Sequence, residues 1–302
     1  MNDNFKGIVI SGPTGVGKTN MSLVLGKKLK LDIISADASQ IYREMNIGTA
    51  KITKEEMDGL KHHLLDITNP GEDYSVGDFE VEVNRILKEK NGENILIVGG
   101  TGLYIKSITD GFSKLPPKDE KIREILENKS IEEIKEILLK LDEKSYNEID
   151  LNNKLRLVRA VEICLITGKK FSELKTKNIK NNKYRFLKIF LTRDREELYN
   201  RINERVEMMF LQGLEEEARD IYKKYKNKLY KISSIGYKEF FRYFDGECSL
   251  GEVKDDIKRE SRRYAKRQLT WFRKEKDYLI YNLSEMREEN IIEEILKKWE
   301  KF

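Results

Sequence analysis

The chain has 302 residues, of which 39% are hydrophobic and 37% are charged, and its formal net charge is +5. With only four prolines and no low-complexity tract, it is expected to be ordered over most of its length, which argues against a disordered protein. Its two cysteines lie far apart without metal-ligand neighbours, and no signal peptide or long apolar stretch is present. These features argue against a disulfide scaffold, a zinc site and a membrane protein, and they favour the cytoplasm.

Apolar runs and one helical pattern alternate in the first part of the chain. Residues 8–10 form an apolar run that leads into glycine and proline, and residues 21–29 place apolar side chains along one helical face. Residues 31–35 and 94–98 are further apolar runs. Apolar strands that alternate with helices predict a parallel sheet that is covered on both faces.

The pattern changes after Gly111. Residues 118–183 are charged and helical in pattern, whereas residues 186–191 again predict a strand. We therefore predict an α/β fold with a core formed by residues 1–113 and 185–302. Residues 114–184 are expected to form a helical insertion domain.

The last third of the chain is also mostly helical in pattern. One long helix is predicted at residues 196–225, a second at 258–276 and a last strand at 278–283. The segment 258–276 carries nine lysines or arginines against two glutamates, with aromatic residues between them. This basic segment has three interpretations, namely a solvated face, a clamp for polyphosphate and a track for RNA.

A complete phosphate-binding motif follows the first strand. It fits the pattern G-x-x-x-x-G-K-[ST] and consists of Gly12, Pro13, Thr14, Gly15, Val16, Gly17, Lys18 and Thr19. Glycines let backbone N–H groups turn toward phosphate oxygens, and the following helix adds its positive end. Lys18 supplies a charge for the terminal phosphates, and the Thr19 hydroxyl is placed to bind Mg²⁺. The motif predicts a P-loop NTPase-like core, and it is shared by ATP-binding and other nucleotide-binding proteins.

Asp37 stands directly after the second predicted strand. Ligands of open α/β sheets bind beyond the carboxyl ends of the strands, so Asp37 is expected to face the ligand of the P-loop. There it could accept a proton or orient a nucleophile. The alternative is that Asp37 caps a short helix over residues 41–45.

Several segments occur in the order in which one enzyme family carries them. They are SGPTGVGKT, ISADASQIYREMNIGTAK (34–51), HHLLDI, YSVGDF, VGGTGLYI (98–105), NNKLRLVRAVEICLITGK (152–169), IGYKEF (235–240) and AKRQLTWFRK (265–274). Together they resemble the bacterial tRNA dimethylallyltransferases, also called tRNA isopentenyltransferases, over nearly the whole chain. The segment at residues 231–234 departs from relatives that carry an arginine there, and Ala38-Ser39 replaces the usual small-Met or Ser-Met pair before Gln40.

The resemblance implies transfer of a dimethylallyl group from dimethylallyl diphosphate to N6 of the adenosine 3′-adjacent to the tRNA anticodon. Residues 12–19 would then hold the donor diphosphate with Mg²⁺ on Thr19, so that Lys18 and Thr19 join Asp37, the general base, in catalysis. Thr101 would line the site beside the reacting atoms. The predicted contacts to the tRNA anticodon stem-loop are Asp37, Ala38, Ser39, Gln40, Thr101, Arg123, Leu155, Arg156, Leu157, Val158 and Arg159. We expect a monomer.

Other readings of the sequence stay open at this point. An isopentenyltransferase that acts on free adenine nucleotides could share the P-loop and Asp37, and a P-loop ATPase or kinase could share the P-loop alone. The third predicted strand ends in Gly99-Gly100-Thr101 without the acid that such ATPases use, which weakens that reading. A non-catalytic RNA-binding protein would not need Lys18 and Asp37 together.

Three further side chains have more ordinary interpretations. His62 and His63 are the only histidines, and neighbours in a strand cannot both face one metal ion, so packing or hydrogen bonding is favoured. Tyr104 either borders the substrate channel or occupies a helix core position.

Overall fold

The computed structural model describes residues 5–111, 115–175 and 184–302. The chain divides into two compact units, one formed by Met1–Thr109 with Asn182–Phe302 and the other by Asp110–Asn181. We call them the sheet unit and the helical unit, and each is described by itself. The expected first boundary, at residues 113 and 114, falls outside the described residues.

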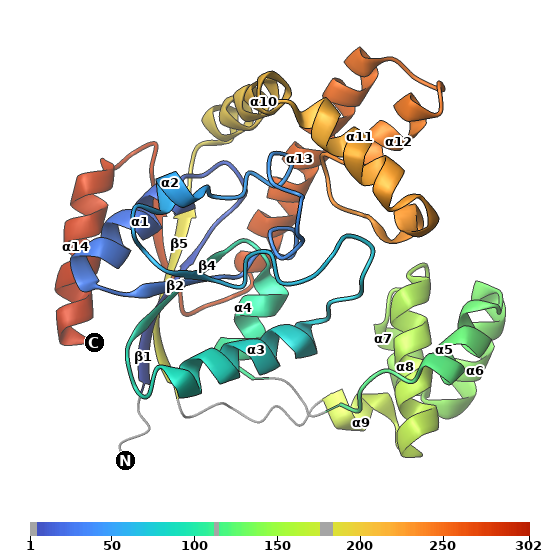
Figure 1. Cartoon of the computed structure of the whole chain (residues 1–302). Helices are drawn as coiled ribbons and strands as arrows, with labels where there is room; N and C mark the ends of the chain where they lie inside the picture. Colours follow the sequence, from blue (N-terminus) through green and yellow to red (C-terminus); the bar gives the residue numbers. More distant parts are fainter. Residues whose placement is uncertain (1–4, 112–114, 176–183) are drawn as a thin grey trace. The chain divides into compact units, whose positions relative to one another are not determined.

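The sheet unit contains one parallel six-stranded sheet with the strand order β3-β2-β4-β1-β5-β6 (Figure 1). The strands are β1 (Phe5–Ser11), β2 (Asp32–Ser35), β3 (His62–His63), β4 (Ile95–Gly99), β5 (Tyr184–Thr192) and β6 (Leu279–Asn282). The sequence predicted all of these except β3, whose two residues are too few to give a pattern. The α/β fold with a parallel sheet core is thus confirmed.

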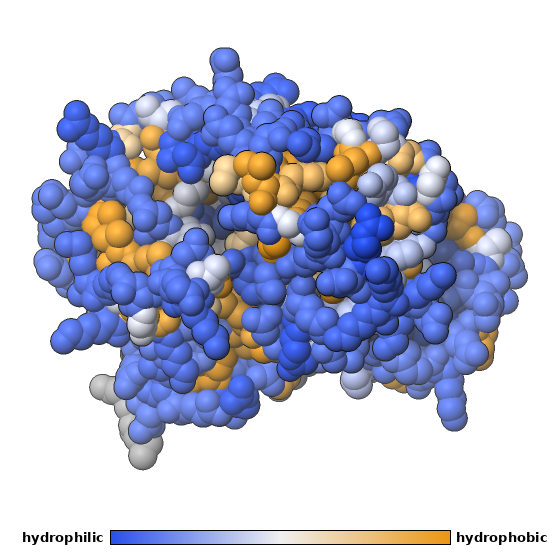
Figure 2. Space-filling model, turned by 45° about the horizontal axis from the view of Figure 1, so that its top comes forward, coloured by the Kyte–Doolittle hydropathy of each residue, from blue (hydrophilic) through white to orange (hydrophobic). Residues whose placement is uncertain are grey.

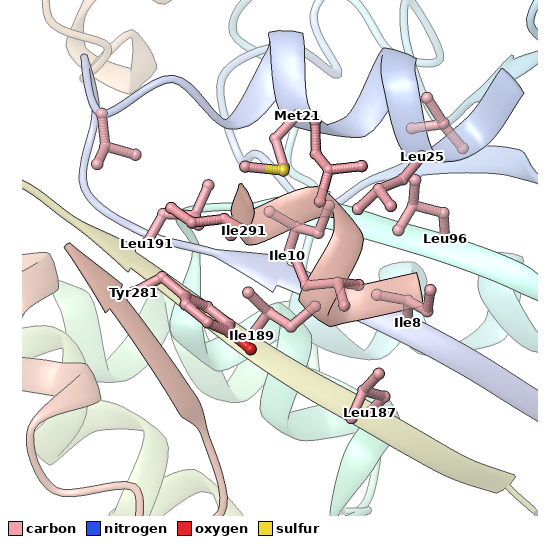
Figure 3. Close-up of a cluster of buried hydrophobic side chains, with 14 of the residues drawn as sticks. Ile8, Ile10, Met21, Leu25, Leu96, Leu187, Ile189, Leu191, Tyr281 and Ile291 are labelled. Carbon is pink, nitrogen blue, oxygen red and sulfur yellow. The ribbon is translucent and has the colours of Figure 1, made fainter. Parts of the chain in front are cut away.

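Helices cover both faces of the sheet. They are α1 (Lys18–Leu29), α3 (Val76–Glu89), α4 (Gly102–Thr109), α10 (Arg195–Leu211), α13 (Leu250–Phe272) and α14 (Glu288–Lys301). The short helix α2 (Lys54–Met57) has no buried residue. On one face, Met21 and Leu25 of α1 and Ile291 of α14 pack on alternate residues of the central strands (Figure 3). On the other face, α3 and α4 cover the strands, and Tyr104 stacks on Phe79 at 4.3 Å between ring centroids. Tyr104 is therefore a core residue.

A third apolar cluster joins α10 and α13 to α11 (Leu214–Lys224), η1 (Lys226–Lys231) and α12 (Lys238–Phe244). The prediction of one helix over residues 196–225 was wrong, because the chain breaks between α10 and α11. Gly213 takes a left-handed φ of 96° at the start of α11, which an L side chain rarely adopts. The apolar periodicity continues on both sides of the break and concealed it.

The helical unit contains α5 (Glu120–Glu127), α6 (Ile131–Leu141), α7 (Glu143–Glu148), α8 (Lys154–Thr167) and α9 (Phe171–Lys175). Its core is built around α6 and α8, as the helical periodicity predicted. The buried Asp142 carboxylate accepts hydrogen bonds from the backbone and hydroxyl groups of Ser145 and Ser172. Burial acts to raise its pKa, and these hydrogen bonds outweigh that effect and lower the pKa.

The molecular surface matches the charged composition. The face drawn in Figure 2 is mostly hydrophilic, and apolar residues reach it in separate patches. Within the three described ranges, no helix combines the length and apolar character that a bilayer span requires.

Candidate active site

The P-loop wraps from the end of β1 into the first turn of α1. Gly15 and Gly17 have φ angles of 81° and 115°, in the region that L side chains avoid. Helix α1 begins at Lys18 with Gly17 as its N-cap, and no side chain caps it. The free N–H groups of its first turn and its positive end therefore suit an anion.

Lys18 is held inside this loop. Its Nζ donates to the carbonyl oxygens of Gly12 and Pro13, at 2.9 Å each. Burial is the main cause that lowers the pKa of Lys18 to about 8. The charge of Asp37 acts to raise this pKa, and the charge of Arg205 acts to lower it. An anion at the P-loop would therefore strengthen the protonated form.

Gln268 of α13 joins the P-loop to the end of β4. Its Oε1 accepts from the backbone N–H of Thr14 at 2.8 Å, and its Nε2 donates to the Gly100 carbonyl at 3.0 Å. A Cβ at Gly100 would lie 2.0 Å from this Nε2, which explains the glycine. The buried amide of Gln268 thus fixes two strand ends against each other.

Asp37 follows β2 at the same edge of the sheet. Its Oδ1 accepts from the backbone N–H of Ser39 at 2.9 Å, which closes a turn. Residues 41–45 form no helix, so the alternative of a helix cap is wrong. The Thr101 hydroxyl accepts from the Ala38 N–H at 3.1 Å and so places Thr101 beside this turn.

Gln40 is fixed by both ends of its amide. Its Oε1 accepts from the Ser35 hydroxyl at 3.2 Å, and its Nε2 donates to the carbonyls of Thr49 and Ala50. Residues 46–48, which come just before Thr49, are also held in place. The Glu217 carboxylate accepts from their N–H groups and from the Tyr237 hydroxyl.

Tyr264 of α13 adds an aromatic ring to this edge. Burial and the charge of Asp37 raise the pKa of Tyr264 to about 12, although hydrogen bonds with Thr101 and Gln268 act to lower it. The Arg267 guanidinium lies over the ring, 5.6 Å from its centroid. The hydroxyl is therefore protonated and neutral at physiological pH.

Three arginines contact the P-loop, and sequence reasoning missed all of them. Arg193 Nε donates to the Val16 carbonyl at 2.9 Å, and Arg201 Nε donates to the Gly15 carbonyl at 3.0 Å. Arg205 Nη2 donates to the Thr14 hydroxyl at 2.5 Å. Two signals could have found them: Arg193 follows a buried strand, and Arg201 and Arg205 are one turn apart on α10.

Thr19 offers one hard oxygen at the exposed start of α1. Within the described residues, no group of three or more carboxylate, histidine or cysteine side chains could hold a metal ion. The donor set therefore fits a Mg²⁺ ion that takes its other ligands from phosphate oxygens and water.

The predicted tRNA contacts in the helical unit differ in how far their side chains are exposed. Leu155 and Arg156 are exposed on α8, whereas Leu157 and Val158 are buried in its core. The side chains of Leu157 and Val158 thus stabilise the packing of α8. Arg123 and Arg159, described next, are partly exposed.

Both arginines bind one buried carboxylate. Glu162 is fully buried and accepts from Arg123 at 2.9 and 3.2 Å, from Arg159 at 2.6 Å and from the Asp119 N–H at 2.8 Å. Burial acts to raise the pKa of Glu162, and the two guanidinium groups with the backbone N–H hold it below its usual value.

The basic segment belongs to α13 up to Phe272, so residues 273–276 lie beyond the helix. Several of its charges are paired within the sheet unit: Lys258 with Glu207, Arg259 with Asp256, Arg263 with Glu260, and Arg262 with the Asn203 amide. Over the described residues, Lys266 and Arg273 are exposed and make no ion pair.

The two histidines make the expected hydrogen bonds. His63 Nε2 lies 2.9 Å from the Asp32 carboxylate, and His62 Nδ1 lies 3.0 Å from the Leu60 carbonyl.

Comparisons with known proteins give one consistent result. The family model described as IPP transferase matches residues 40–275. The tRNA dimethylallyltransferase of Fusobacterium nucleatum is 52% identical over 98% of this chain and 97% of its own, and that of Finegoldia magna is 44% identical over 97% and 98%.

Solved structures agree with the sequence relatives. The tRNA isopentenylpyrophosphate transferase of Bacillus halodurans is 40% identical, has a TM-score of 0.72 and is matched over 96% of this chain and 94% of its own. A eukaryotic dimethylallyltransferase acting on tRNA is 28% identical, with a TM-score of 0.82 over 93% of this chain and 74% of its own. This chain therefore belongs to the IPP transferase family.

Proposed function

We propose that this enzyme transfers the dimethylallyl group of dimethylallyl diphosphate to N6 of the adenosine 3′-adjacent to the anticodon of tRNA. The observation that carries the proposal is the pairing, at one sheet edge, of a P-loop with a carboxylate. Asp37 is close enough to shift the pKa values of Lys18, Arg205 and Tyr264. An anionic leaving group and a proton acceptor therefore have places side by side.

The reaction needs both parts. The bond between C1 of the donor and its bridging oxygen breaks, and the electron pair leaves with the diphosphate. A bond forms between the adenine N6 and C1, and the N6 proton goes to the Asp37 carboxylate. Lys18 and the backbone N–H groups of residues 12–19 stabilise the charge that develops on the leaving oxygen.

Mg²⁺ would be held by the Thr19 hydroxyl together with the donor's own phosphate oxygens. When bound, it supplies charge neutralisation of the leaving group. The chain's part is to orient the diphosphate between this hydroxyl and Lys18.

The neighbouring side chains suit recognition of a base. Asp37, Ala38, Ser39 and Gln40 form the turn after β2, Thr101 contacts that turn, and the Tyr264 ring lies beside them. A target base must leave its stack to react, and aromatic rings favour its extruded state. Exposed residues of α8 and α13 are the proposed contacts to the anticodon stem-loop.

We propose that the protein works as a monomer in the cytoplasm. One chain carries the P-loop, Asp37 and the proposed tRNA contacts, so the reaction needs no second copy. The two free cysteines suit a reducing compartment.

The test is a transfer assay with purified protein, Mg²⁺, dimethylallyl diphosphate and unmodified tRNA, followed by nucleoside mass spectrometry. We expect isopentenyladenosine from tRNA and none from AMP, ADP or ATP. Asp37→Asn should lower the rate by about 10² to 10⁴, the usual effect of a positioned base. Asp58→Asn, at an exposed position, is the matched control.

Other outcomes would redirect the proposal. Product from free nucleotides alone would favour an adenylate isopentenyltransferase. Phosphate release from ATP without any transfer would favour a P-loop ATPase.

A further inference from the structure

We propose that Glu217 of α11 is a positioning residue for the acceptor side of the site, which acts through the loop of residues 46–50 and through Gln40. This inference rests on the proposed function and adds to it a residue that works only through its neighbours. It assigns to α11 the task of fixing the half of the site that receives the target base, while other elements fix the half that receives the diphosphate.

The first observation is the convergence of backbone donors on one carboxylate. Glu217 Oε2 accepts from the N–H groups of Asn46 and Ile47, at 3.0 Å each. Its Oε1 accepts from the N–H groups of Ile47 and Gly48, at 2.9 and 3.1 Å. Successive N–H groups that point at one centre form a concavity for an anion. Here the chain fills that concavity with its own side chain, so the loop is held to α11.

The second observation is the packing of Tyr237 at the same carboxylate. The Tyr237 hydroxyl donates to Glu217 Oε1 at 2.6 Å, and its ring is fully buried. Burial and the charge of Glu217 raise the pKa of Tyr237 far above its ordinary value, so the hydroxyl keeps its proton and stays a donor. A Cβ at Gly48 would lie 2.6 Å from the ring, which shows how closely the loop and the ring fit. Glu217 thus joins the loop to the start of α12.

The third observation is the continuation of these contacts to Gln40. Residues 46–51 form a closed turn with two internal backbone hydrogen bonds of 2.9 Å. In that turn the carbonyl oxygens of Thr49 and Ala50 accept from Gln40 Nε2, at 3.4 and 3.2 Å. A shift of the turn would therefore take both acceptors from Gln40, the last residue of the turn after β2 that is proposed to recognise the base.

The diphosphate half of the site is held by different residues. Gln268 of α13 contacts the P-loop at Thr14, and three arginines of the sheet unit contact it elsewhere. Across the described residues, the hydrogen bonds of Glu217 go to residues 46–48 and to Tyr237, and none reaches the P-loop. A change at Glu217 should therefore affect the acceptor and leave the donor.

The reaction makes such positioning important. The adenine N6 must approach C1 of the donor in line with the bond that breaks, and its proton must face Asp37. A misplacement of about 1 Å can lower a rate by about 10². Loosening the turn that holds Gln40 should therefore lower kcat/KM for the acceptor, although no contact to either substrate is removed.

The test varies acceptor and donor separately in steady-state kinetics and measures the affinity for inorganic diphosphate by calorimetry. We expect Glu217→Ala to lower kcat/KM for tRNA by about tenfold to a hundredfold, and Glu217→Gln to lower it less, because one oxygen still accepts. Both variants should keep the diphosphate affinity within about twofold of wild type. Glu216→Gln is the matched control, since Glu216 is the exposed neighbour on the same helix and should behave as wild type.

A double-mutant cycle with Gln40→Ala separates a positioning role from a general loss of structure. Because Glu217 acts through Gln40, the two losses should combine to less than their product, whereas independent losses multiply. Losses that multiply, wild-type kinetics in Glu217→Ala, or an equal loss of diphosphate affinity in Glu217→Gln would each overturn the inference.

The proposed function and this inference have separate readouts. The reaction of the wild type with tRNA decides the proposed function, and the ratio of variant to wild type decides this inference. If the wild type modifies only a free nucleotide, the proposed function fails. The same acceptor-side loss in Glu217→Ala, with unchanged diphosphate affinity, would still support the inference.

Discussion

Buried charge is handled in opposite ways in the two units. In the helical unit, the Glu162 carboxylate is enclosed by Arg123, Arg159 and a backbone N–H, and the charge is fully compensated. At the P-loop of the sheet unit, the partly buried cations Lys18 and Arg205 donate to neutral oxygens, and among the described residues Asp37 is the carboxylate whose charge opposes theirs. Around Glu162 the chain itself supplies the opposite charges, and we call this a closed network, which stabilises the fold. Around Lys18 and Arg205 it supplies too little negative charge, and we call this an open network, which suits an anionic ligand.

Glu162→Gln should give the largest effect, because it breaks the closed network. Removing one partner of a buried ion pair leaves uncompensated charge and typically costs about 3–5 kcal/mol. We expect the free energy of unfolding of the helical unit to fall by about that amount. Hydrogen exchange of the α8 amides in the full chain measures it.

Glu132→Gln is the control for this substitution, because its side chain is 72% exposed and its ion pair with Lys135 is long. It should change stability by less than about 0.5 kcal/mol. If the two variants behave alike, the arginines around Glu162 do not stabilise the unit, and the comparison fails.

Lys18→Met tests the open network at the P-loop, where we expect a large effect on activity and a small effect on stability. Losing a cation that faces developing charge should lower kcat/KM for the donor by about 10² to 10³. The free energy of unfolding should change by less than about 1 kcal/mol, since the cost of burying the cation offsets its two hydrogen bonds. Steady-state kinetics and urea unfolding measure the two quantities, and a large loss of stability would contradict the contrast with Glu162.

The sequence predicted those parts of the site whose chemistry is local. The P-loop is one continuous segment, and Asp37 was expected at the same edge because the ends of parallel strands share one edge of a sheet. Gln268 and Arg205 reach Thr14 from 254 and 191 residues away, and no local pattern encodes such contacts. In the same way, Arg123 and Glu162 are 39 residues apart, so Arg123 could not be told from a surface arginine.

The fold was predictable for the same reason. Continuous apolar runs marked the long strands, and helical periodicity marked α6 and α8. The break at Gly213 was missed because the apolar periodicity continues on both sides of it. A single residue with a left-handed φ does not change that periodicity.

The pH dependence sharpens the description of the P-loop. Burial lowers the pKa of Lys18 to about 8, and in the proposed reaction only the protonated form attracts the diphosphate. Donor kcat/KM should therefore be constant from neutral pH to about pH 8 and fall as pH rises further, by up to about tenfold per unit. Lys18→Arg, which stays protonated, should lose this limb of the profile. An identical decline in Lys18→Arg would assign the titration to another group.

The smallest effect is expected at α13 and its C-cap Arg273, where paired and unpaired charges lie close together along the chain. Each phosphate contact that is lost lowers the slope of log K against log salt by about 0.7 to 0.9. Lys266→Gln with Arg273→Gln should reduce the slope for tRNA binding by one to two such steps, as filter binding at several salt concentrations would show. Arg259→Gln with Arg263→Gln is the control, because both arginines are paired with acidic neighbours on the helix. Equal slopes for the two double variants would mean that ion pairing within the helix does not determine which charges contact the tRNA. The distinction between closed and open networks would then hold only for buried groups.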